Sequence, residues 1–231
     1  MATISIIMPV YNEIKTVRTV IEAVMKAPMD GCTKELVIVD DGSTDGTREI
    51  LETLRHEGII VLLNERNSGK GYSVRRGLMA ATGDYYAIQD ADLEYDPADY
   101  GLMLALLRRE HLTVVFGRRF GGLNHWQPIS RLQFLAHRII GASSALLSGV
   151  RIEDPTSCYK LFTREARDWY CARLCSNTFA IETEIVALTG RGKLKYREMP
   201  IHYYPRTYAD GKKIRWTDGV RILWSIIKFN W

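Results

Sequence analysis

Several features that define common protein classes are missing from this chain of 231 residues. It has no run of about 18 apolar residues, the length that a membrane-spanning helix needs. It also lacks the basic start, long apolar stretch and cleavage site of a secretory signal, so we expect a cytoplasmic protein. Its four cysteines include no C-x-x-C pair, and we therefore expect reduced thiols and not a structural zinc site.

Charge is distributed unevenly along the chain. The whole sequence has 31 Lys and Arg against 27 Asp and Glu, a net charge of +4. Residues 1–100 hold 10 basic and 17 acidic side chains (10 − 17 = −7), and residues 101–231 hold the remaining 21 and 10 (21 − 10 = +11). An acidic half suits metal binding and a basic half suits a phosphate-bearing or membrane-bound partner, although two solvated surfaces of opposite sign would give the same pattern.

Short apolar runs alternate with segments of helical spacing in the first half of the chain. This alternation is typical of an α/β fold with a mostly parallel central sheet flanked by helices. The predicted strands are 4–8, 35–39, 59–63, 84–89 and 112–116, and the predicted helices are 14–26, 46–57, 70–82 and 97–110. Such sheets bind ligands at the carboxyl ends of their strands, so the loops that follow the strands are the candidate sites.

The pattern changes after about residue 118. We expect a long amphipathic helix at 129–148 and, at the end of the chain, a basic helix rich in aromatic side chains. The predictions between these two helices are a short strand at 158–162, helices near 164–174 and 181–189, and a hairpin at 193–204. No repeat or linker interrupts the sequence, so we expect a single domain with one functional lobe at 1–117 and another at 118–231.

The loops after the first two strands carry polar side chains suited to a nucleotide. The first loop lacks the G-x-G-x-x-G motif of a nicotinamide-binding enzyme. Tyr11 could stack on a base and Glu13 could accept a hydrogen bond from a ribose or base, whereas Asn12 could also cap the next helix. The second loop begins with Asp40 and Asp41, whose mutual repulsion requires donors or a cation, and either could accept hydrogen bonds from a nucleobase.

The loop after the third strand reads Asn67-Ser68-Gly69-Lys70-Gly71. It is not a Walker A loop, because Gly71 stands where Ser or Thr would bind magnesium. One interpretation is a turn followed by the start of a helix. The other is a helix N-terminus that, together with Lys70, lies near phosphate or sugar.

The fourth strand ends in three alternating acids, Asp90, Asp92 and Glu94. On an extended segment these side chains point the same way. Three carboxylates on one side need a cation, and hard oxygen ligands favour Mg²⁺ or Mn²⁺. A dehalogenase-type phosphatase also uses D-x-D, but it places the nucleophilic Asp on the first strand, so that reading is disfavoured.

Six motifs, in this order, resemble those of glycosyltransferase family 2. Within the family, the chain is similar to the branch of dolichol-phosphate mannose synthase and bacterial polyprenyl-phosphate glycosyltransferases, and the resemblance covers nearly the whole chain. Each motif is weak alone, but their shared order is specific. They are Pro9-Val10-Tyr11-Asn12-Glu13, Asp40-Asp41-Gly42-Ser43-Thr44-Asp45-Gly46-Thr47, Gly69-Lys70-Gly71, Gln89-Asp90-Ala91-Asp92-Leu93-Glu94, Gly117-Arg118-Arg119-Phe120 and Asp154-Pro155-Thr156-Ser157-Cys158-Tyr159-Lys160.

The resemblance implies the nucleotide-sugar-binding fold called GT-A and assigns roles to individual residues. It implies a metal, Mg²⁺ or Mn²⁺, on Asp92 with Asp90 beside it. Glu94 is a further candidate ligand at a position where relatives often carry Gln. The residues expected to act in catalysis are Asp92, Arg131 and Arg206. The residues expected to bind substrates are Pro9, Tyr11, Asn12, Glu13, Asp40, Asp41, Lys70, Asp90, Arg119, Arg138 and Lys212.

The nature of the attacking group decides the mechanism. A hydroxyl acceptor needs a carboxylate base, for which Asp154, Glu182 and Glu184 are candidates. A lipid monophosphate has a second pKa of about 6 and is already anionic, so it needs only cations to place it. The resemblance places Arg119, Arg131 and Arg206 near phosphates, although a solvated basic helix surface would also explain Arg131 and Arg138.

The sequence therefore predicts a metal-dependent inverting transfer of a sugar from a UDP- or GDP-sugar to a polyprenyl (undecaprenyl or dolichyl) phosphate. The alternatives are transfer to a hydroxyl on a glycan, protein or small molecule, and a non-catalytic subunit that binds nucleotide sugars. No nucleic-acid partner is expected. The helix at 216–231 either lies on the cytoplasmic face of a membrane, as its Trp, Lys and Arg content suggests, or packs on the domain.

Overall fold

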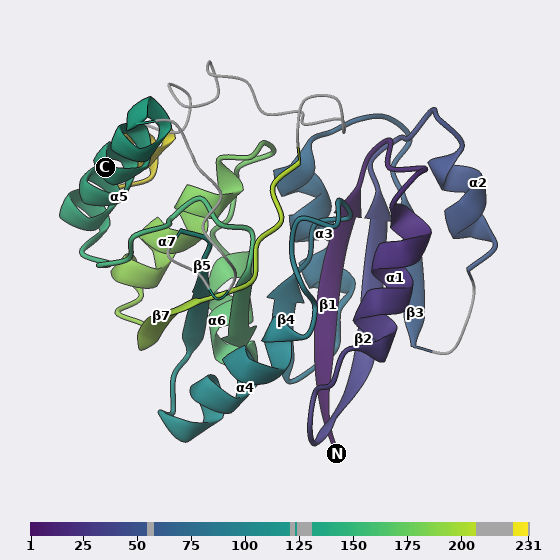
Figure 1. Ribbon diagram of the computed structural model, residues 1–231, viewed down its shortest axis with the longest axis horizontal. Helices are drawn as coiled ribbons and strands as arrows, with labels where there is room; N and C mark the ends of the chain where they lie inside the picture. Colours follow the sequence, from purple (N-terminus) through teal and green to yellow (C-terminus); the bar gives the residue numbers. More distant parts are fainter. Residues whose placement is uncertain (55–57, 121–122, 124–130, 207–223, 231) are drawn as a thin grey trace.

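Residues 1–54, 58–120, 123, 131–206 and 224–230 are described by the computed structural model, apart from the side chains of 131–137. A seven-stranded sheet with the order β3-β2-β1-β4-β6-β5-β7 forms the centre. Figure 1 shows α1 and α4 in front of this sheet, with α3 and α6 behind it. The fold is thus the α/β layer arrangement that the alternating pattern predicts.

The first half of the chain forms the predicted elements with small shifts at their ends. The two longest strands, β1 and β2, extend beyond their apolar runs, because their first residues pair with each other as well. The elements are β1 (Ala2–Val10), α1 (Val17–Lys26), β2 (Cys32–Asp40), α2 (Thr47–Glu52), β3 (Ile59–Leu63), α3 (Lys70–Ala80), β4 (Tyr85–Ile88), α4 (Asp99–Arg109) and β5 (Val114–Arg118).

The second half extends the same sheet, and one prediction for it is wrong. The elements are α5 (Arg131–Ser148), β6 (Lys160–Thr163), α6 (Arg164–Cys171), α7 (Ile181–Arg191) and β7 (Tyr196–Pro200). In place of the hairpin expected at 193–204, β7 pairs in parallel with β5 at the edge of the sheet. Apolar and polar residues alternate in the same way in a hairpin and in an edge strand. The sequence pattern therefore could not show that β7 pairs with β5, which lies far away in the chain. The predicted lobe boundary after residue 117 falls within β5.

The strands at the centre of the sheet are buried on both faces. Ile4, Ile6, Ile7 and Met8 of β1 have no exposed surface, as expected for a parallel strand covered by helices on each side. Between β4 and β5 lies β6, which runs antiparallel to both. Because β1, β2 and β4 are parallel, their carboxyl ends all lie on the same side of the sheet, which we call its carboxyl edge.

Buried tyrosines lie beneath the loop that follows β4. The ring of Tyr159 stacks between those of Tyr95 and Tyr100, with a centroid distance of 4.5 Å to each. The hydroxyl of Tyr100 donates to the carbonyl of Ile88 (2.6 Å), and that of Tyr159 donates to Oε1 of Gln89 (2.7 Å). These bonds satisfy the buried hydroxyls and fix the end of β4.

The two glycines around Lys70 allow a close contact between the start of α3 and residues 176–177. A Cβ at Gly69 would lie 2.1 Å from the carbonyl oxygen of Asn177, and one at Gly71 would lie 2.4 Å from that of Ser176. The N–H of Gly71 donates to the carbonyl of Asn177 at 3.0 Å. A main-chain carbonyl therefore caps the N-terminus of α3.

We predict that Gly71→Ala destabilises the protein by about 1–3 kcal/mol, because the new methyl group meets backbone that cannot move aside. Helix propensity alone predicts the opposite, since Ala is favoured over Gly by about 1 kcal/mol. Urea unfolding measures the difference. Met79→Ala on the same helix is the control: Met79 is 69% exposed, so its replacement should change stability by less than about 0.5 kcal/mol. A stabilising Gly71→Ala would contradict this packing account.

Candidate active site

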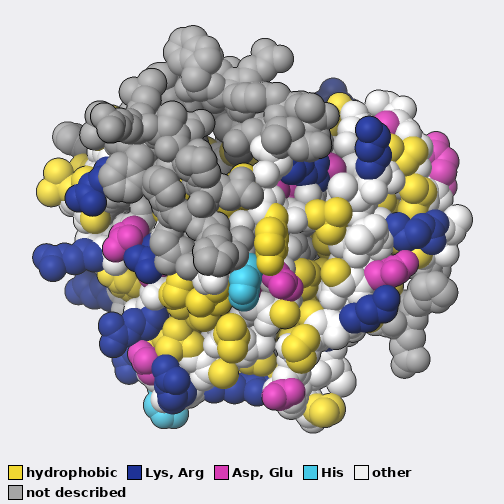
Figure 2. Space-filling view, viewed as in Figure 1, with side chains coloured by type: hydrophobic (Ala, Val, Ile, Leu, Met, Phe, Trp, Pro, Cys, Tyr) yellow, Lys and Arg dark blue, Asp and Glu magenta, His cyan; other side chains and the backbone are white. Residues whose placement is uncertain are grey.

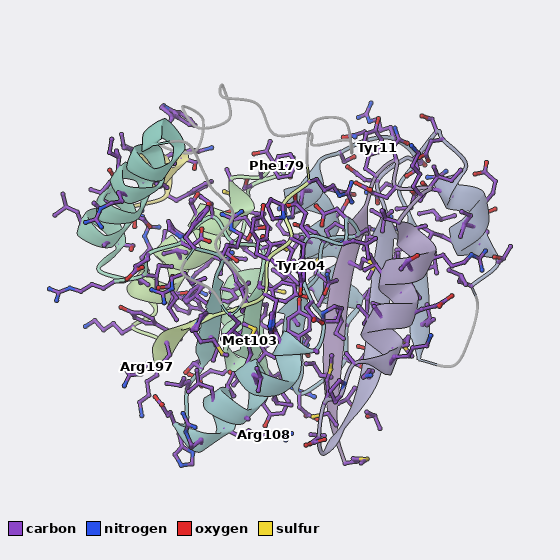
Figure 3. All side chains as sticks on the ribbon, viewed as in Figure 1. Tyr11, Met103, Arg108, Phe179, Arg197 and Tyr204 are labelled. Atoms are coloured by element: carbon purple, nitrogen blue, oxygen red, sulfur yellow. The ribbon has the colours of Figure 1, made fainter. Side chains whose placement is uncertain are left out.

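The loops that follow β1, β2 and β4 meet at the carboxyl edge of the sheet. This meeting follows from the register, in which β1 pairs in parallel with β2 on one side and with β4 on the other. Figure 3 shows Tyr11 and Phe179 at this edge, whereas Arg108 and Arg197 lie toward the opposite edge. The site predicted from these loops is therefore assembled in one place.

Asn12 joins the first loop to the second. Its backbone is left-handed, with φ of 52°, its N–H donates to Oγ of Ser43 (2.9 Å), and its Oδ1 accepts from the N–H of Thr44 (2.8 Å). The next helix begins only at Val17, so the alternative role of Asn12 as a helix cap is wrong. Pro9, at the end of β1, and Tyr11 are half-buried beside this junction.

The adjacent acids Asp40 and Asp41 are both satisfied by donors within the protein. Asp40 is fully buried and accepts from Nε and Nη2 of Arg48 (2.9 and 2.7 Å). Its predicted contact with a nucleotide is therefore not supported, because its carboxylate faces inward. Asp41 is 3% exposed and accepts from Nδ2 of Asn64 (2.7 Å) and from the N–H groups of Ser68 and Gly69 (2.9 and 2.8 Å), which fixes the loop before α3.

The ammonium group of Lys70 is ion-paired to two carboxylates of the protein. Its Nζ lies 2.7 Å from Oδ1 of Asp90 and 2.9 Å from Oε1 of Glu182. Burial disfavours its charge, but Asp90 and Glu182 outweigh this and hold the pKa of Lys70 well above its ordinary value. Since Asn177 caps α3, the helix N-terminus predicted for phosphate binding is occupied by the protein's own backbone.

The segment from Asp90 to Glu94 bends, so the expected extended geometry is wrong. Leu93 has a left-handed backbone with φ of 62°. The turn brings the N–H of Glu94 within 3.2 Å of Oδ1 of Asp92. Burial, together with the charges of Asp90 and Glu94, raises the pKa of Asp92 to about 7, against a lowering effect of Arg206. The carboxylate cluster thus forms through a turn and not through strand alternation.

Arg206 links the first loop to the segment after β4. Its Nη1 and Nη2 each lie 3.1 Å from Oε2 of Glu13, and its Nε donates to the carbonyl of Asp92. The N–H of Arg206 and the hydroxyl of Tyr203 both donate to the carboxylate of Glu94, at 2.8 and 3.2 Å. Residues 203–206 therefore lie against the site, with the guanidinium between two predicted motifs.

The described residues offer a metal ion one candidate ligand, Asp92, and not the predicted three carboxylates. Among the described residues, no three Asp, Glu, His or Cys side chains converge on a point that could hold a metal. Asp90 binds Lys70, and Glu94 binds Arg206 and Tyr203, so the predicted ligand triad is not formed. No described side chain donates a hydrogen bond to Asp92, which accepts the backbone N–H of Glu94, and burial and two neighbouring carboxylates disfavour its charge. Mg²⁺ commonly takes one or two carboxylates and completes its shell with phosphate and water.

The three candidate bases are all buried and bound to internal partners. Asp154 forms a two-bond pair with Arg119 (2.8 Å each), and Glu182 lies between Lys70 and Lys160. Glu184 accepts from the N–H groups of Cys175 and Ser176, at 2.8 and 2.9 Å. The guanidinium of Arg119, predicted to lie near phosphate, is thus bound to a carboxylate of the protein. The rings of Phe120 and Tyr203 each lie 5.4 Å from it.

Two of the predicted site residues have side chains that the structure does not describe. Arg131 begins α5, but its side chain lies outside the described residues, as does the whole of Lys212. Arg138 is exposed on α5. Sequence reasoning missed Asn64 and Lys160 as site-supporting residues, and the only signal for Lys160 was its place at the end of the last quoted motif.

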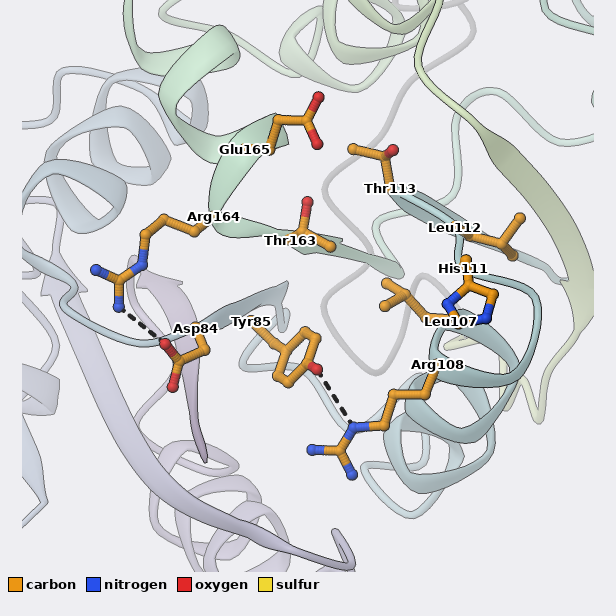
Figure 4. Close-up of a pocket in the computed structure, with 10 residues that line it drawn as sticks. All are labelled: Asp84, Tyr85, Leu107, Arg108, His111, Leu112, Thr113, Thr163, Arg164 and Glu165. Carbon is orange, nitrogen blue, oxygen red and sulfur yellow. Dashed lines mark hydrogen bonds and ion pairs between the residues drawn. The ribbon is translucent and has the colours of Figure 1, made fainter. Parts of the chain in front are cut away.

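An open cavity of about 560 Å³ lies away from this site. Figure 4 shows its lining, which includes Asp84, Arg164 and Arg108, at the edge where β4 begins and not where it ends. Arg164 binds Asp84 at 3.0 Å, and Arg108 contacts the hydroxyl of Tyr85 at 3.4 Å. These cations already have partners, and the predicted site residues do not line the cavity.

Comparison with known proteins agrees with the fold and the motifs. The chain is 32% identical over 204 residues to glycosyltransferase AglJ of Haloferax volcanii, an alignment that covers 88% of this chain and 63% of the relative. It is 27% identical over 245 residues to dolichyl-phosphate beta-glucosyltransferase ALG5D of Trichomonas vaginalis, covering 97% and 72%. The chain thus spans less than two thirds of the length of the Haloferax relative.

Among solved structures, the chain resembles glucosyl-3-phosphoglycerate synthase of Mycobacterium tuberculosis bound to UDP. The TM-score is 0.72 at 18% identity, covering 99% of this chain and 80% of the other. A complex of that enzyme with Mn²⁺, UDP and glucosyl-3-phosphoglycerate gives a TM-score of 0.71 at 22% identity, covering the same shares. This similarity shows the GT-A fold. The model of the family called glycosyl transferase family 2 matches residues 5–168, more than half of the sequence, and the chain therefore belongs to this family of sugar-transferring enzymes.

Proposed function

We propose that this protein transfers a sugar from a UDP- or GDP-sugar to a polyprenyl phosphate by a metal-dependent inverting displacement. The dolichyl-phosphate beta-glucosyltransferase among its relatives supports a lipid phosphate as acceptor. The structural relative bound to UDP with Mg²⁺ or Mn²⁺ supports a nucleotide-sugar donor and a divalent ion. The division into a donor lobe at 1–117 and an acceptor lobe at 118–231 is part of the proposal.

The observation that carries the proposal is the engagement of the candidate bases. Asp154, Glu182 and Glu184 are each no more than 4% exposed and bound to internal partners. A hydroxyl acceptor needs such a base to remove its proton, whereas a lipid phosphate already carries negative charge at neutral pH. The engagement of these three described carboxylates therefore favours the phosphate over the hydroxyl acceptor.

On the donor side, Asp92 is the residue that would hold the metal, with the diphosphate and water as further ligands. When bound, the ion supplies positive charge to the leaving nucleoside diphosphate. Asp90, fixed by Lys70, lies beside this ligand. Tyr11 is proposed to stack on the base of the nucleotide, and Arg131 and Arg138 on α5 are proposed to attract the acceptor phosphate.

The C-terminal helix at 224–230 presents one face to the protein and another to its surroundings. Ser225 and Ile226 are buried, and Ser225 bonds to Thr183 of α7 at 2.9 Å. Trp224 is 63% exposed and Ile227 53% exposed, with the cation of Lys228 5.4 Å from the Trp224 ring. The predicted apolar residues Val220, Leu223 and Trp231 lie outside the described residues.

An exposed apolar face with basic neighbours supports peripheral contact with a membrane. Leu146 of α5 is also 84% exposed, and Figure 2 shows a group of Lys and Arg side chains at the left of the view. No helix within the described residues is long and apolar enough to cross a bilayer. We propose that this face lies on the membrane surface that carries the acceptor lipid.

Asp92→Asn should lower kcat/KM for the nucleotide sugar by at least about 100-fold, because it removes the proposed metal ligand and so the charge on the leaving group. The measurement is nucleotide release in the presence of Mn²⁺ and lipid phosphate. Asp30→Asn, at an exposed position, is the control and should retain activity. An Asp92→Asn variant of normal activity would exclude the metal role of this residue.

Undecaprenyl phosphate should accept the sugar at least about 100-fold faster than undecaprenol, because only the phosphate brings its own anionic oxygen to a site whose three described candidate bases are engaged. The two lipids differ in that group alone. Labelled UDP- and GDP-sugars with product extraction measure the transfer. Equal transfer to the alcohol, or transfer only to a soluble hydroxyl compound, would favour the hydroxyl-acceptor alternative.

Replacing both Trp224 and Ile227 by Ser should lower binding to vesicles with anionic lipid at least about ten-fold, because each exposed apolar side chain contributes about 1.5–3 kcal/mol when buried. Vesicle flotation measures the bound fraction. Met79→Ser on α3, also exposed, should float like the wild type. Unchanged flotation of the double variant would assign the helix to packing alone.

A further inference from the structure

Four charged side chains form a continuous row from the core to the carboxylates that follow β4. Lys160 on β6 binds Glu182 on α7, Glu182 binds Lys70 on α3 (2.9 Å), and Lys70 binds Asp90 (2.7 Å). The exposed fraction of the side chains increases along the row, from 1% at Lys160 through 5% and 11% to 21% at Asp90. The row therefore connects the interior to the candidate active site.

Glu182 is the anion that separates the two cations of this row. Its Oε1 lies near Lys70, and its Oε2 binds Lys160. Burial would raise the pKa of Glu182, but the two ammonium groups outweigh this and lower it below the ordinary value. Glu182 is buried and ion-paired to two lysines, so its carboxylate is poorly placed to take a proton from a substrate. It is well placed to hold two lysines.

Lys70 in turn determines where the carboxylate of Asp90 lies. Among the described residues, Lys70 is the one side chain that binds this carboxylate. A lysine ordinarily samples many rotamers, and ordering it costs conformational entropy. Here its backbone is fixed by the contact of Gly71 with Asn177, its ammonium is held by Glu182, and the ring of Phe179 lies 5.7 Å from Nζ.

We propose that Glu182 is a positioning residue for donor binding: it holds Lys70 so that Lys70 fixes the carboxylate of Asp90 beside the metal-bound diphosphate. Lys160 balances the charge of Glu182 in the core. The inference rests on the proposed function and adds to it a buried residue of α7 that touches neither substrate nor metal. It also replaces the role of general base that the sequence left open for Glu182.

Three variants test this role: Glu182→Gln, Lys160→Met and the combination of the two. Isothermal titration of UDP and of GDP, each with Mn²⁺, measures the dissociation constant, and thermal unfolding measures Tm. Glu182→Gln should weaken binding of the preferred nucleotide at least about ten-fold. It should also lower Tm by about 5–10 °C, because Lys160 is left as an uncompensated buried charge. The double variant removes that charge, so its Tm should recover while its binding stays weak.

Each other result would overturn the proposal. If the double variant recovered both Tm and binding, Glu182 would act only through stability. If Glu182→Gln bound the nucleotide like the wild type but lost turnover, Glu182 would be the general base. If Lys160→Met alone weakened binding as much as Glu182→Gln, charge balance and not the hold on Lys70 would set the affinity. A wild-type protein that binds neither nucleotide would instead overturn the proposed function itself.

Discussion

Repulsion among carboxylates is the constraint on which this site depends. The fold brings Glu13, Asp40, Asp41, Asp90 and Asp92 to one edge of the sheet, together with Glu94. Adjacent buried charges of one sign are unstable unless donors or cations accompany them. Nearly every one of these acids has such a partner: Arg48 for Asp40, backbone N–H groups for Asp41, and Lys70 for Asp90.

Asp92 differs from these acids, because among the described residues its carboxylate accepts only a backbone N–H, that of Glu94 at 3.2 Å. Its neighbours are satisfied from within the protein, whereas the charge of Asp92 is opposed by burial and by Asp90 and Glu94. Burial and like charges that shift the pKa of a carboxyl group in this way are features of candidate functional residues. The other acids then serve to shape the loops, and the family resemblance and the local electrostatics point to the same residue.

The opposite charges of the two halves of the chain have a structural reason. The basic second half supplies Arg206 to Glu13 and Arg164 to Asp84, so part of the charge asymmetry is neutralised by ion pairs between the halves. Residues 176–177 also cap α3, which carries Lys70. The candidate site is therefore built by both halves, although most of its motifs lie in the first.

The sequence by itself determined the layer class, the strand ends that form the site and the family, because apolar periodicity and motif order are local properties. It could not determine that β7 pairs with β5, that Arg119 is bound to Asp154, or that Gly69 and Gly71 admit the backbone of 176–177. Only the tertiary structure decided which acids are ion-paired and that, among the described residues, Asp92 has no side-chain donor. The reason is that an ion pair joins residues far apart in the chain, and no local pattern records its distance or its burial.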